Sequence, residues 1–366
     1  MNIPISQPTL TPEDKHNLVE AFDSGWISSI GENLRKFESS FASYIGTKYC
    51  LAVSNGTTAL ELALSTIDKR QDRNEIIIPS FTFAAVANAV IATGFVPVPV
   101  DVSLESWNIT NSSIEIAISE RTAALIVVHS YGNPVEDINL IKNLCKSRGV
   151  LLIEDCAEAH GATFGSAKVG SLSDISCFSF YGNKIITCGE GGAVLTSSET
   201  LYRTMACKRD HGMSKTKRYF HEMPGFNYRM TNLQAAILIS QLKRIDQILY
   251  LRHEQQVRYD QHLEHLGFTR AAQSSGNYSV NWLYTVKCPN HVNITLLVKL
   301  LASKGIDTRP VFNPISTFPY INAPYSCSNS LDLSKQCLSL PTFTHLSLEE
   351  IDGICAVLQD CLFSHN

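Results

Sequence analysis

The feature that most constrains the fold is a series of short segments that are apolar throughout and that alternate with helix-like segments. The apolar segments are residues 50–54, 76–79, 96–102, 122–130 and 150–156, and the helical patterns between them are 57–66, 83–94 and 139–148. Strands that are covered on both faces are apolar throughout, whereas half-exposed strands alternate. The pattern therefore predicts an α/β fold, in which a mostly parallel sheet carries helices on both sides.

The second half of the chain has a different character. Residues 233–263 lack glycine and proline and place apolar side chains at helical spacing, and residues 270–366 mix strands such as 282–288 with helical stretches. A chain of 366 residues is long enough for two domains. We expect a large domain over residues 1–240 and a smaller C-terminal α+β domain over residues 241–366.

Composition excludes several classes of protein. The formal net charge is −4 and no basic run occurs, which argues against a nucleic-acid binder. No apolar run approaches the ~18–20 residues of a membrane span, and the N-terminus lacks the pattern of a signal peptide. The eleven cysteines are scattered, odd in number and without a CxxC pair, which is typical of buried thiols in a reducing compartment. We expect a soluble cytoplasmic protein.

Residues 54–60 (SNGTTAL) are the first candidate for a binding site. A strand, a glycine turn and two hydroxyl residues precede a helix there. The first N–H groups of a helix are unpaired and carry partial positive charge, so a phosphate can bind them, with Thr57 and Thr58 beside it. An ordinary turn with a helix N-cap has the same pattern.

Asp155 and Lys184 are the candidates for chemistry. Asp155 ends a buried strand, at the edge where open α/β sheets bind ligands. It can pair with a protonated pyridine nitrogen or simply cap a helix. Lys184 follows Ser179 in a segment with few other charges and precedes a glycine-rich run, residues 189–192. A desolvated lysine can form a covalent bond to a carbonyl cofactor, although most lysines lie on surface turns.

These segments, with GFNYRMTN at residues 225–232, resemble the DegT/DnrJ/EryC1/StrS sugar aminotransferases. The motifs that carry the resemblance are DSGWISS, VSNGTTAL, IEDCAEA, FSFYGNKIIT with GEGG, and GFNYRMTN. It extends from Trp26 to Phe312. It implies a pyridoxal-5′-phosphate (PLP)-dependent transferase of fold type I, the aspartate aminotransferase fold, that works as a homodimer with shared active sites.

The resemblance also implies a role for each residue of the cofactor site. Lys184 would hold PLP covalently and later carry a proton between cofactor and sugar, and Asp155 would pair with the pyridine nitrogen. Phe83 would stack on the ring face, and Glu158 would lie near the ring oxygen. The phosphate would be bound by Thr57, Thr58, Ser179 and, from the neighbouring subunit, Asn227.

A second set of residues would line the substrate side of the pocket. By the same resemblance these are Trp26, Ser28, Arg309, Phe312 and Ser316. Relatives usually carry histidine where this chain has Ser316, which leaves the identity of the sugar and of its nucleotide open.

The implied reaction moves an amino group from L-glutamate, which leaves as 2-oxoglutarate, to a nucleotide-linked 4-keto-6-deoxy sugar. The likeness is greatest to members that convert GDP-4-keto-6-deoxy-D-mannose to GDP-perosamine for O-antigen and lipopolysaccharide synthesis. A dTDP- or UDP-linked substrate is an alternative, and a PLP-dependent sugar dehydratase is a weaker one, because those relatives replace the lysine with histidine. A non-catalytic scaffold conflicts with the joint presence of Asp155 and Lys184, and a nicotinamide dehydrogenase lacks its glycine fingerprint.

No metal site is predicted. His129, His160 and His211 have no ligand spacing, and no HExxH, GxGxxG or GxxxxGK[ST] motif occurs. We expect these histidines to be packed or surface residues.

Overall fold

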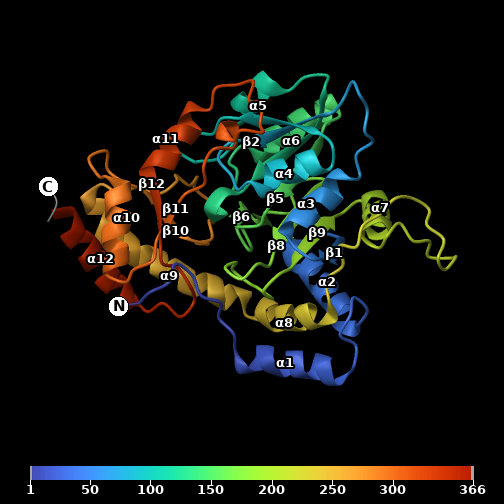
Figure 1. The fold of residues 1–366 in the computed structure, drawn as a ribbon, viewed down its shortest axis with the longest axis horizontal. Helices are drawn as coiled ribbons and strands as arrows, with labels where there is room; N and C mark the ends of the chain where they lie inside the picture. Colours follow the sequence, from blue (N-terminus) through green and yellow to red (C-terminus); the bar gives the residue numbers. More distant parts are fainter. Residues whose placement is uncertain (1, 364–366) are drawn as a thin grey trace.

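The apolar segments of the first half form the central sheet of the protein, which a computed structural model describes over residues 2–363 (Figure 1). The sheet has seven strands in the order β1-β9-β8-β5-β4-β2-β3. The strands are β1 (Tyr49–Val53), β2 (Glu75–Pro79), β3 (Val96–Val100), β4 (Thr122–Val128), β5 (Leu151–Asp155), β8 (Ile175–Ser179) and β9 (Gly192–Thr196). The helices associated with it are α1 (Pro12–Asp23), α2 (Glu32–Ile45), α3 (Gly56–Leu64), α4 (Ala85–Ala92), α5 (Asn111–Ala117), α6 (Ile138–Arg148), α7 (Glu199–Arg209) and α8 (Asn232–Lys243).

Both faces of the sheet are buried, as the unbroken apolar strands predict. In β1, Leu51 and Val53 pack into one core with α3 and α4, while Cys50 and Ala52 pack into another with α2 and α8. Successive strand residues point to opposite faces, so each face of β1 reaches a different helical layer. The predicted α/β class and covered sheet are confirmed.

One strand departs from the parallel arrangement. β9 pairs antiparallel with both β1 and β8, whereas β5 pairs parallel with β4 and β8, and β2 pairs parallel with β3 and β4. The connection between β8 and β9 is the segment 180–191, which contains no helix and leads back into an antiparallel neighbour. The sheet is therefore mixed but mostly parallel, in agreement with the predicted fold.

The C-terminal elements gather on one side of the central sheet, in orange and red (Figure 1). They are α9 (Ile245–Leu263), β10 (Tyr284–Lys287), α10 (Ile294–Ser303), β11 (Arg309–Pro310), α11 (Ser328–Gln336), β12 (Cys337–Leu340) and α12 (Leu348–Phe363). The strands form a sheet of order β10-β12-β11. Ile3, from the start of the chain, packs into the core of this region. The domain boundary at residues 240/241 stays a prediction, and it falls near the junction of α8 and α9.

Among the described residues, no helix has the length and apolar character needed to cross a membrane. All eleven cysteines are unbridged, and nine of them are buried. The expectation of buried thiols rather than a disulfide framework is therefore confirmed.

Candidate active site

Three strands end at one edge of the central sheet and place the predicted residues there. β1, β5 and β8 run in the same direction, and their carboxyl ends lead to Asn55, Asp155 and Ser179. Open α/β sheets bind ligands at this edge because helix N-termini and strand-end side chains converge there. The candidate site begins at this edge.

The start of α3 lies directly after β1 and is held by a reciprocal cap. The Thr58 N–H donates to Asn55 Oδ1 at 2.9 Å, and the Asn55 N–H donates to the Thr58 hydroxyl at 3.1 Å. Thr58 is thus engaged in capping the helix, whereas the Thr57 hydroxyl makes no hydrogen bond within residues 2–363. Phosphate binding by these residues stays a prediction, and Thr57 has the more available hydroxyl.

The helix start also touches Ser179 at the end of β8. A Cβ atom added to Gly56 would lie 2.8 Å from the Ser179 Cβ, closer than real Cβ contacts. Glycine at position 56 therefore lets two segments that are distant in sequence meet, so that the helix N-terminus and the Ser179 side chain share one location.

Lys184 lies on the loop between β8 and β9 and turns inward rather than to solvent. Its backbone N–H donates to the Tyr181 carbonyl at 2.9 Å. Its Nζ is 3.9 Å from Glu158 Oε1 and 3.9 Å from the centroid of the Trp282 ring. The alternative of a lysine on a surface turn is therefore wrong, because the side chain is almost completely buried beside an acid and an aromatic face.

Burial controls the charges of this cluster. It lowers the pKa of Lys184 and raises the pKa of Asp155, and the opposite charges of the two groups offset part of each shift. It raises the pKa of Glu158 to about 7, against the attraction of the Lys184 ammonium. Buried ionisable groups that shift in this way are typical of functional sites. A lysine with a lowered pKa is a better nucleophile near neutral pH.

Glu158 is held by a strained part of the backbone. The Tyr131 N–H donates to Glu158 Oε2 at 2.7 Å, and Tyr131 adopts a positive φ of 53°. That conformation is uncommon for a bulky residue and persists where surrounding contacts fix it. The Tyr131 hydroxyl in turn accepts the N–H of Phe312 at 3.2 Å.

Two residues of the site were not predicted, namely Tyr131 and Trp282. Trp282 is buried, and its indole N–H donates to the carbonyl of Asn183, the residue before Lys184, at 3.0 Å. Local sequence gives little signal for either, since Trp282 begins a strand-like run and Tyr131 follows one. Both residues are aromatic with a polar tip, and such residues usually need a hydrogen-bond partner when they are buried. That general preference is the one hint that the sequence contains.

The aromatic residues predicted for the site lie together. Phe83 is 58% exposed, and its ring centroid is 5.6 Å from that of Phe312. Phe312 stacks on Tyr131 at 5.2 Å. Ser316, on the segment after Phe312, accepts a hydrogen bond from the Ser80 hydroxyl at 3.0 Å. The structure thus joins Phe312 and Ser316 to the segment that carries Phe83.

Four predicted residues have partners other than Lys184 within one chain. Asn227 is exposed, and its side chain accepts from Arg229 at 2.8 Å. Arg309 is exposed in β11 and pairs with Asp307 at 2.9 Å. Trp26 and Ser28 follow α1, where their carbonyls accept from the side chain and backbone of Asn232 at 2.7 Å each. No hydrogen bond or ion pair among the described residues links these four to Lys184, and their roles stay predictions.

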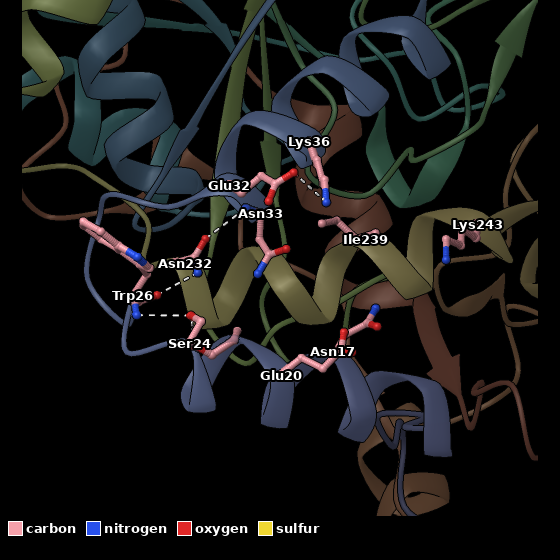
Figure 2. A pocket seen from close by; sticks show the side chains of 11 residues that line it. Asn17, Glu20, Ser24, Trp26, Glu32, Asn33, Lys36, Asn232, Ile239 and Lys243 are labelled. Carbon is pink, nitrogen blue, oxygen red and sulfur yellow. Dashed lines mark hydrogen bonds and ion pairs between the residues drawn. The ribbon is translucent and has the colours of Figure 1, made fainter.

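Trp26 borders a separate pocket of about 470 Å³ between α1, α2 and α8, seen in Figure 2. Its lining is Asn17, Glu20, Ala21, Ser24, Trp26, Glu32, Asn33, Lys36, Asn232, Ile239 and Lys243. Trp26 and Asn232 are joined at one end of it (Figure 2). Neither Asp155 nor Lys184 lines it, so the reactive groups belong to a different location.

Two of the three histidines considered from the sequence, His129 and His160, are packed residues, whereas His211 is half-buried. His129 and Glu154 form a buried pair at 3.0 Å, and His129 Nδ1 accepts the N–H of Val135. Glu154 also accepts from the backbone of Gly170 and Leu172 and from Ser173. His129, Glu154 and Cys156 lie within reach of one ion, but these donors already satisfy the carboxylate. His160 is buried, and burial lowers its pKa to about 3.

The cluster fits the demands that PLP would make of a protein. Its aldehyde needs a buried amine, its ring nitrogen needs an acid, and its phosphate needs N–H and hydroxyl donors. Lys184, Asp155, and the start of α3 with Thr57 and Ser179 meet these demands at one sheet edge. The close approach that Gly56 permits brings the last two together.

Comparison with known proteins agrees with this reading. A family model described as the DegT/DnrJ/EryC1/StrS aminotransferase family matches residues 8–359. The GDP-perosamine synthase of Caulobacter vibrioides is 39% identical, with 98% of each chain covered. The solved structure of Helicobacter pylori PseC, an aminotransferase of pseudoaminic acid biosynthesis, has a TM-score of 0.94, 28% identity and full coverage of both chains. A GDP-4-keto-6-deoxymannose-3-dehydratase with bound GDP-perosamine has a TM-score of 0.89, 25% identity, and coverage of 98% of this chain and 100% of that one.

The predicted family, fold type and cofactor are thereby confirmed. Since both the family model and the relatives extend over nearly the whole chain, this protein belongs to the DegT/DnrJ/EryC1/StrS aminotransferase family and is a PLP-dependent sugar aminotransferase.

Proposed function

We propose that the protein converts GDP-4-keto-6-deoxy-D-mannose to GDP-perosamine, with L-glutamate as amino donor, for the synthesis of a surface polysaccharide. The observation that carries the proposal is the buried amine of Lys184, 3.9 Å from the Glu158 carboxylate, in a chain 39% identical to a GDP-perosamine synthase over nearly its full length. The resemblance supplies the substrate, and the geometry supplies a group able to do the chemistry.

Bound PLP supplies an electron sink that stabilises negative charge on the carbon that loses its proton. The chain's own residues do the rest. Asp155 would stabilise a positive charge at the ring nitrogen, and the Lys184 amine, once released, would take up a proton and return it. The start of α3 would bind the phosphate through its unpaired N–H groups.

We further propose that two copies of the chain share their active sites. Asn227 is exposed and lies on the segment before α8, so it is accessible to a second copy. Its side-chain N–H₂ group donates no hydrogen bond within the described residues, since its contacts to Arg229 use the oxygen. This donor is suited to a phosphate in the partner's site.

Two measurements on the purified enzyme test the activity. L-glutamate should discharge the visible absorbance of the lysine-bound cofactor and release 2-oxoglutarate, and a 4-keto sugar nucleotide should restore the absorbance. GDP-4-keto-6-deoxymannose should then have a kcat/KM at least about tenfold above those of the dTDP- and UDP-4-keto-6-deoxyglucose compounds. A preference for either of the latter would overturn the proposed substrate and leave the aminotransferase in place.

A dehydratase remains the rival that the same fold allows, because one structural relative is a 3-dehydratase. Lys184 argues against it, since the implied dehydratase pattern has histidine at that position. Product analysis separates the two, because an aminotransferase yields an amino sugar with all its hydroxyls, whereas a dehydratase yields a sugar that lacks the 3-hydroxyl.

A further inference from the structure

Trp282 contacts the Lys184 region at two points, the ammonium group of the lysine and the backbone of the residue before it. The Lys184 Nζ lies 3.9 Å from the centroid of the Trp282 ring. The indole N–H donates to the carbonyl of Asn183 at 3.0 Å, so the same ring fixes the backbone just before the lysine. The two contacts span 98 residues of sequence (282 − 184) and join the β8–β9 loop to the start of β10.

The indole itself is firmly held. The Arg252 guanidinium on α9 donates through Nη1 to the carbonyls of Asn281 and Trp282, at 3.2 and 2.8 Å. Arg252 is buried, and burial is the only influence on its pKa, which it lowers to about 10, so no ion pair with a carboxylate compensates its charge among the described residues. The Trp282 ring also stacks with Tyr131 and Phe312, at centroid distances of 5.9 and 6.4 Å. The Trp282 backbone is thus held by Arg252, and its ring is held by Tyr131 and Phe312. A ring held in this way can fix the position of a flexible lysine side chain.

The Trp282 ring is a principal non-covalent partner of the Lys184 amine. The nearest acid, Glu158, is 3.9 Å away, which is beyond hydrogen-bond distance. The other charged or titratable groups nearby are Asp155 at the end of β5, His160 after it, Tyr131, and Arg252 behind the indole. A cation over a desolvated indole face is attracted by the electron-rich ring more strongly than it would be at an exposed site.

We propose that Trp282 is a positioning residue that holds the Lys184 amine at its indole face while that amine is not bonded to the cofactor. The proposal rests on the role given to Lys184 above. In the first half of the reaction the amine would leave the cofactor, and in the second half it would return to the same atom. In each half it must take up one proton and give it back. Trp282 would keep the released amine beside Glu158 and Asp155, and its π face favours the charged form that exists between uptake and return of the proton.

The test uses the full-length protein freed of PLP, so that it does not depend on turnover. Limiting acetic anhydride is applied across a pH series, and acetylation of the Lys184 peptide is quantified by mass spectrometry. The pH at half-maximal rate gives the pKa of the amine irrespective of its accessibility. Trp282→Leu should lower this pKa by about one unit, because a desolvated cation–π contact is worth about that much.

Matched variants identify the cause. Trp282→Phe keeps a π face and should retain most of the shift, whereas it loses the hydrogen bond to Asn183. Phe220→Leu removes the ring beneath Lys217, 4.7 Å from that ammonium on an exposed loop, and should leave the Lys184 profile unchanged. A Trp282→Leu profile that coincides with the wild type overturns the proposal, and so does a Trp282→Phe profile shifted as far as that of Trp282→Leu.

The result is separable from the proposed function. Wild-type protein that forms no covalent link between Lys184 and added PLP would contradict the role of the lysine, whatever the acetylation profile. Protein that links PLP normally but shows no dependence on Trp282 would contradict only the positioning role.

Discussion

Lys184 combines a buried location with two neighbouring acids, and that combination would suit one side chain to both proposed roles, covalent attachment of the cofactor and transfer of protons. Burial lowers the pKa of its amine, while Glu158 and Asp155 oppose that shift. An amine whose pKa moves toward the working pH can give up and take back a proton readily.

Removal of that amine gives the simplest prediction. Lys184→Ala should fold and retain non-covalently bound PLP, but its turnover should fall by at least about 10³-fold, because nucleophile and proton carrier are lost together. The visible spectrum and a single-turnover assay with L-glutamate would show this. Substantial turnover by this variant would refute the assignment, whereas Lys168→Ala, which removes a lysine lying over Tyr44, should retain the wild-type spectrum.

Glu158 gives a prediction about stability and pH. Folding raises its pKa from 4.5 to about 7, so the folded state prefers the protonated acid. The stability that this proton provides is complete below about pH 4.5 and is lost as the pH rises through 7. The Gln side chain of Glu158→Gln cannot ionise. In PLP-free protein, the free energy of unfolding of this variant relative to that of the wild type should therefore increase by about 1–3 kcal/mol when the pH is raised from 5 to 8. Urea unfolding at both values would measure the gain, and an equal difference at the two would contradict the shift.

At the scale of elements, the start of α3 connects helix stability with the binding edge. Asn55→Ala removes the acceptor for the Thr58 N–H and should cost about 1 kcal/mol, with weaker PLP binding as the first turn frays. Asn55→Asp keeps an acceptor and should restore stability but not affinity, since it puts a negative charge beside a phosphate. Thermal unfolding would measure the stability of the variants, and PLP titration would measure their affinity. Equal PLP affinity in the wild type and both variants would contradict a role of the α3 N-terminus in binding the cofactor.

The elements of the first half could be predicted because their sequence and environment agree. Residues 76–79 are apolar throughout, and the structure buries Ile76 and Ile78 on one face and Ile77 on the other. The predicted strands 96–102 and 122–130 end two residues beyond the real ones, since β3 ends at Val100 and β4 at Val128. The predicted helix 83–94 is really Ala85–Ala92, which leaves Phe83 on the loop before it.

The candidate site was less accessible to sequence reasoning, because its contacts join distant segments. Asp155 ends β5 and Lys184 lies on the loop that follows β8, and local sequence patterns reveal both positions. Trp282 reaches Lys184 across 98 residues (282 − 184), and nothing in its neighbourhood distinguishes it from a core aromatic. The left-handed Tyr131 is also hard to predict. It lies in the tight turn of residues 129–133, where a bulky side chain with a φ of 53° is uncommon.

At the scale of the molecule, the proposed sharing of active sites makes a quantitative prediction. Lys184→Ala and Asn227→Ala variants should each be nearly inactive, if each site needs Lys184 from one subunit and Asn227 from the other. After the two are mixed and reassorted, half of the dimers are hybrids, and each hybrid has one intact site. About one quarter of wild-type activity should return. Sites built within one chain would recover none, and sedimentation of the mixture provides the control for assembly.

The placement of β9 has a consequence for how the protein is made. β1 is an edge strand, and its pairing partner β9 comes more than 130 residues later. Tyr49–Val53 can therefore be synthesised long before the strand that completes its ladder leaves the ribosome. Until then an apolar strand with unsatisfied backbone groups is exposed, and such strands attract chaperones or aggregate. Nascent chains that stop before Gly192 should therefore depend on chaperones for solubility, and that dependence should end once Thr196 has emerged.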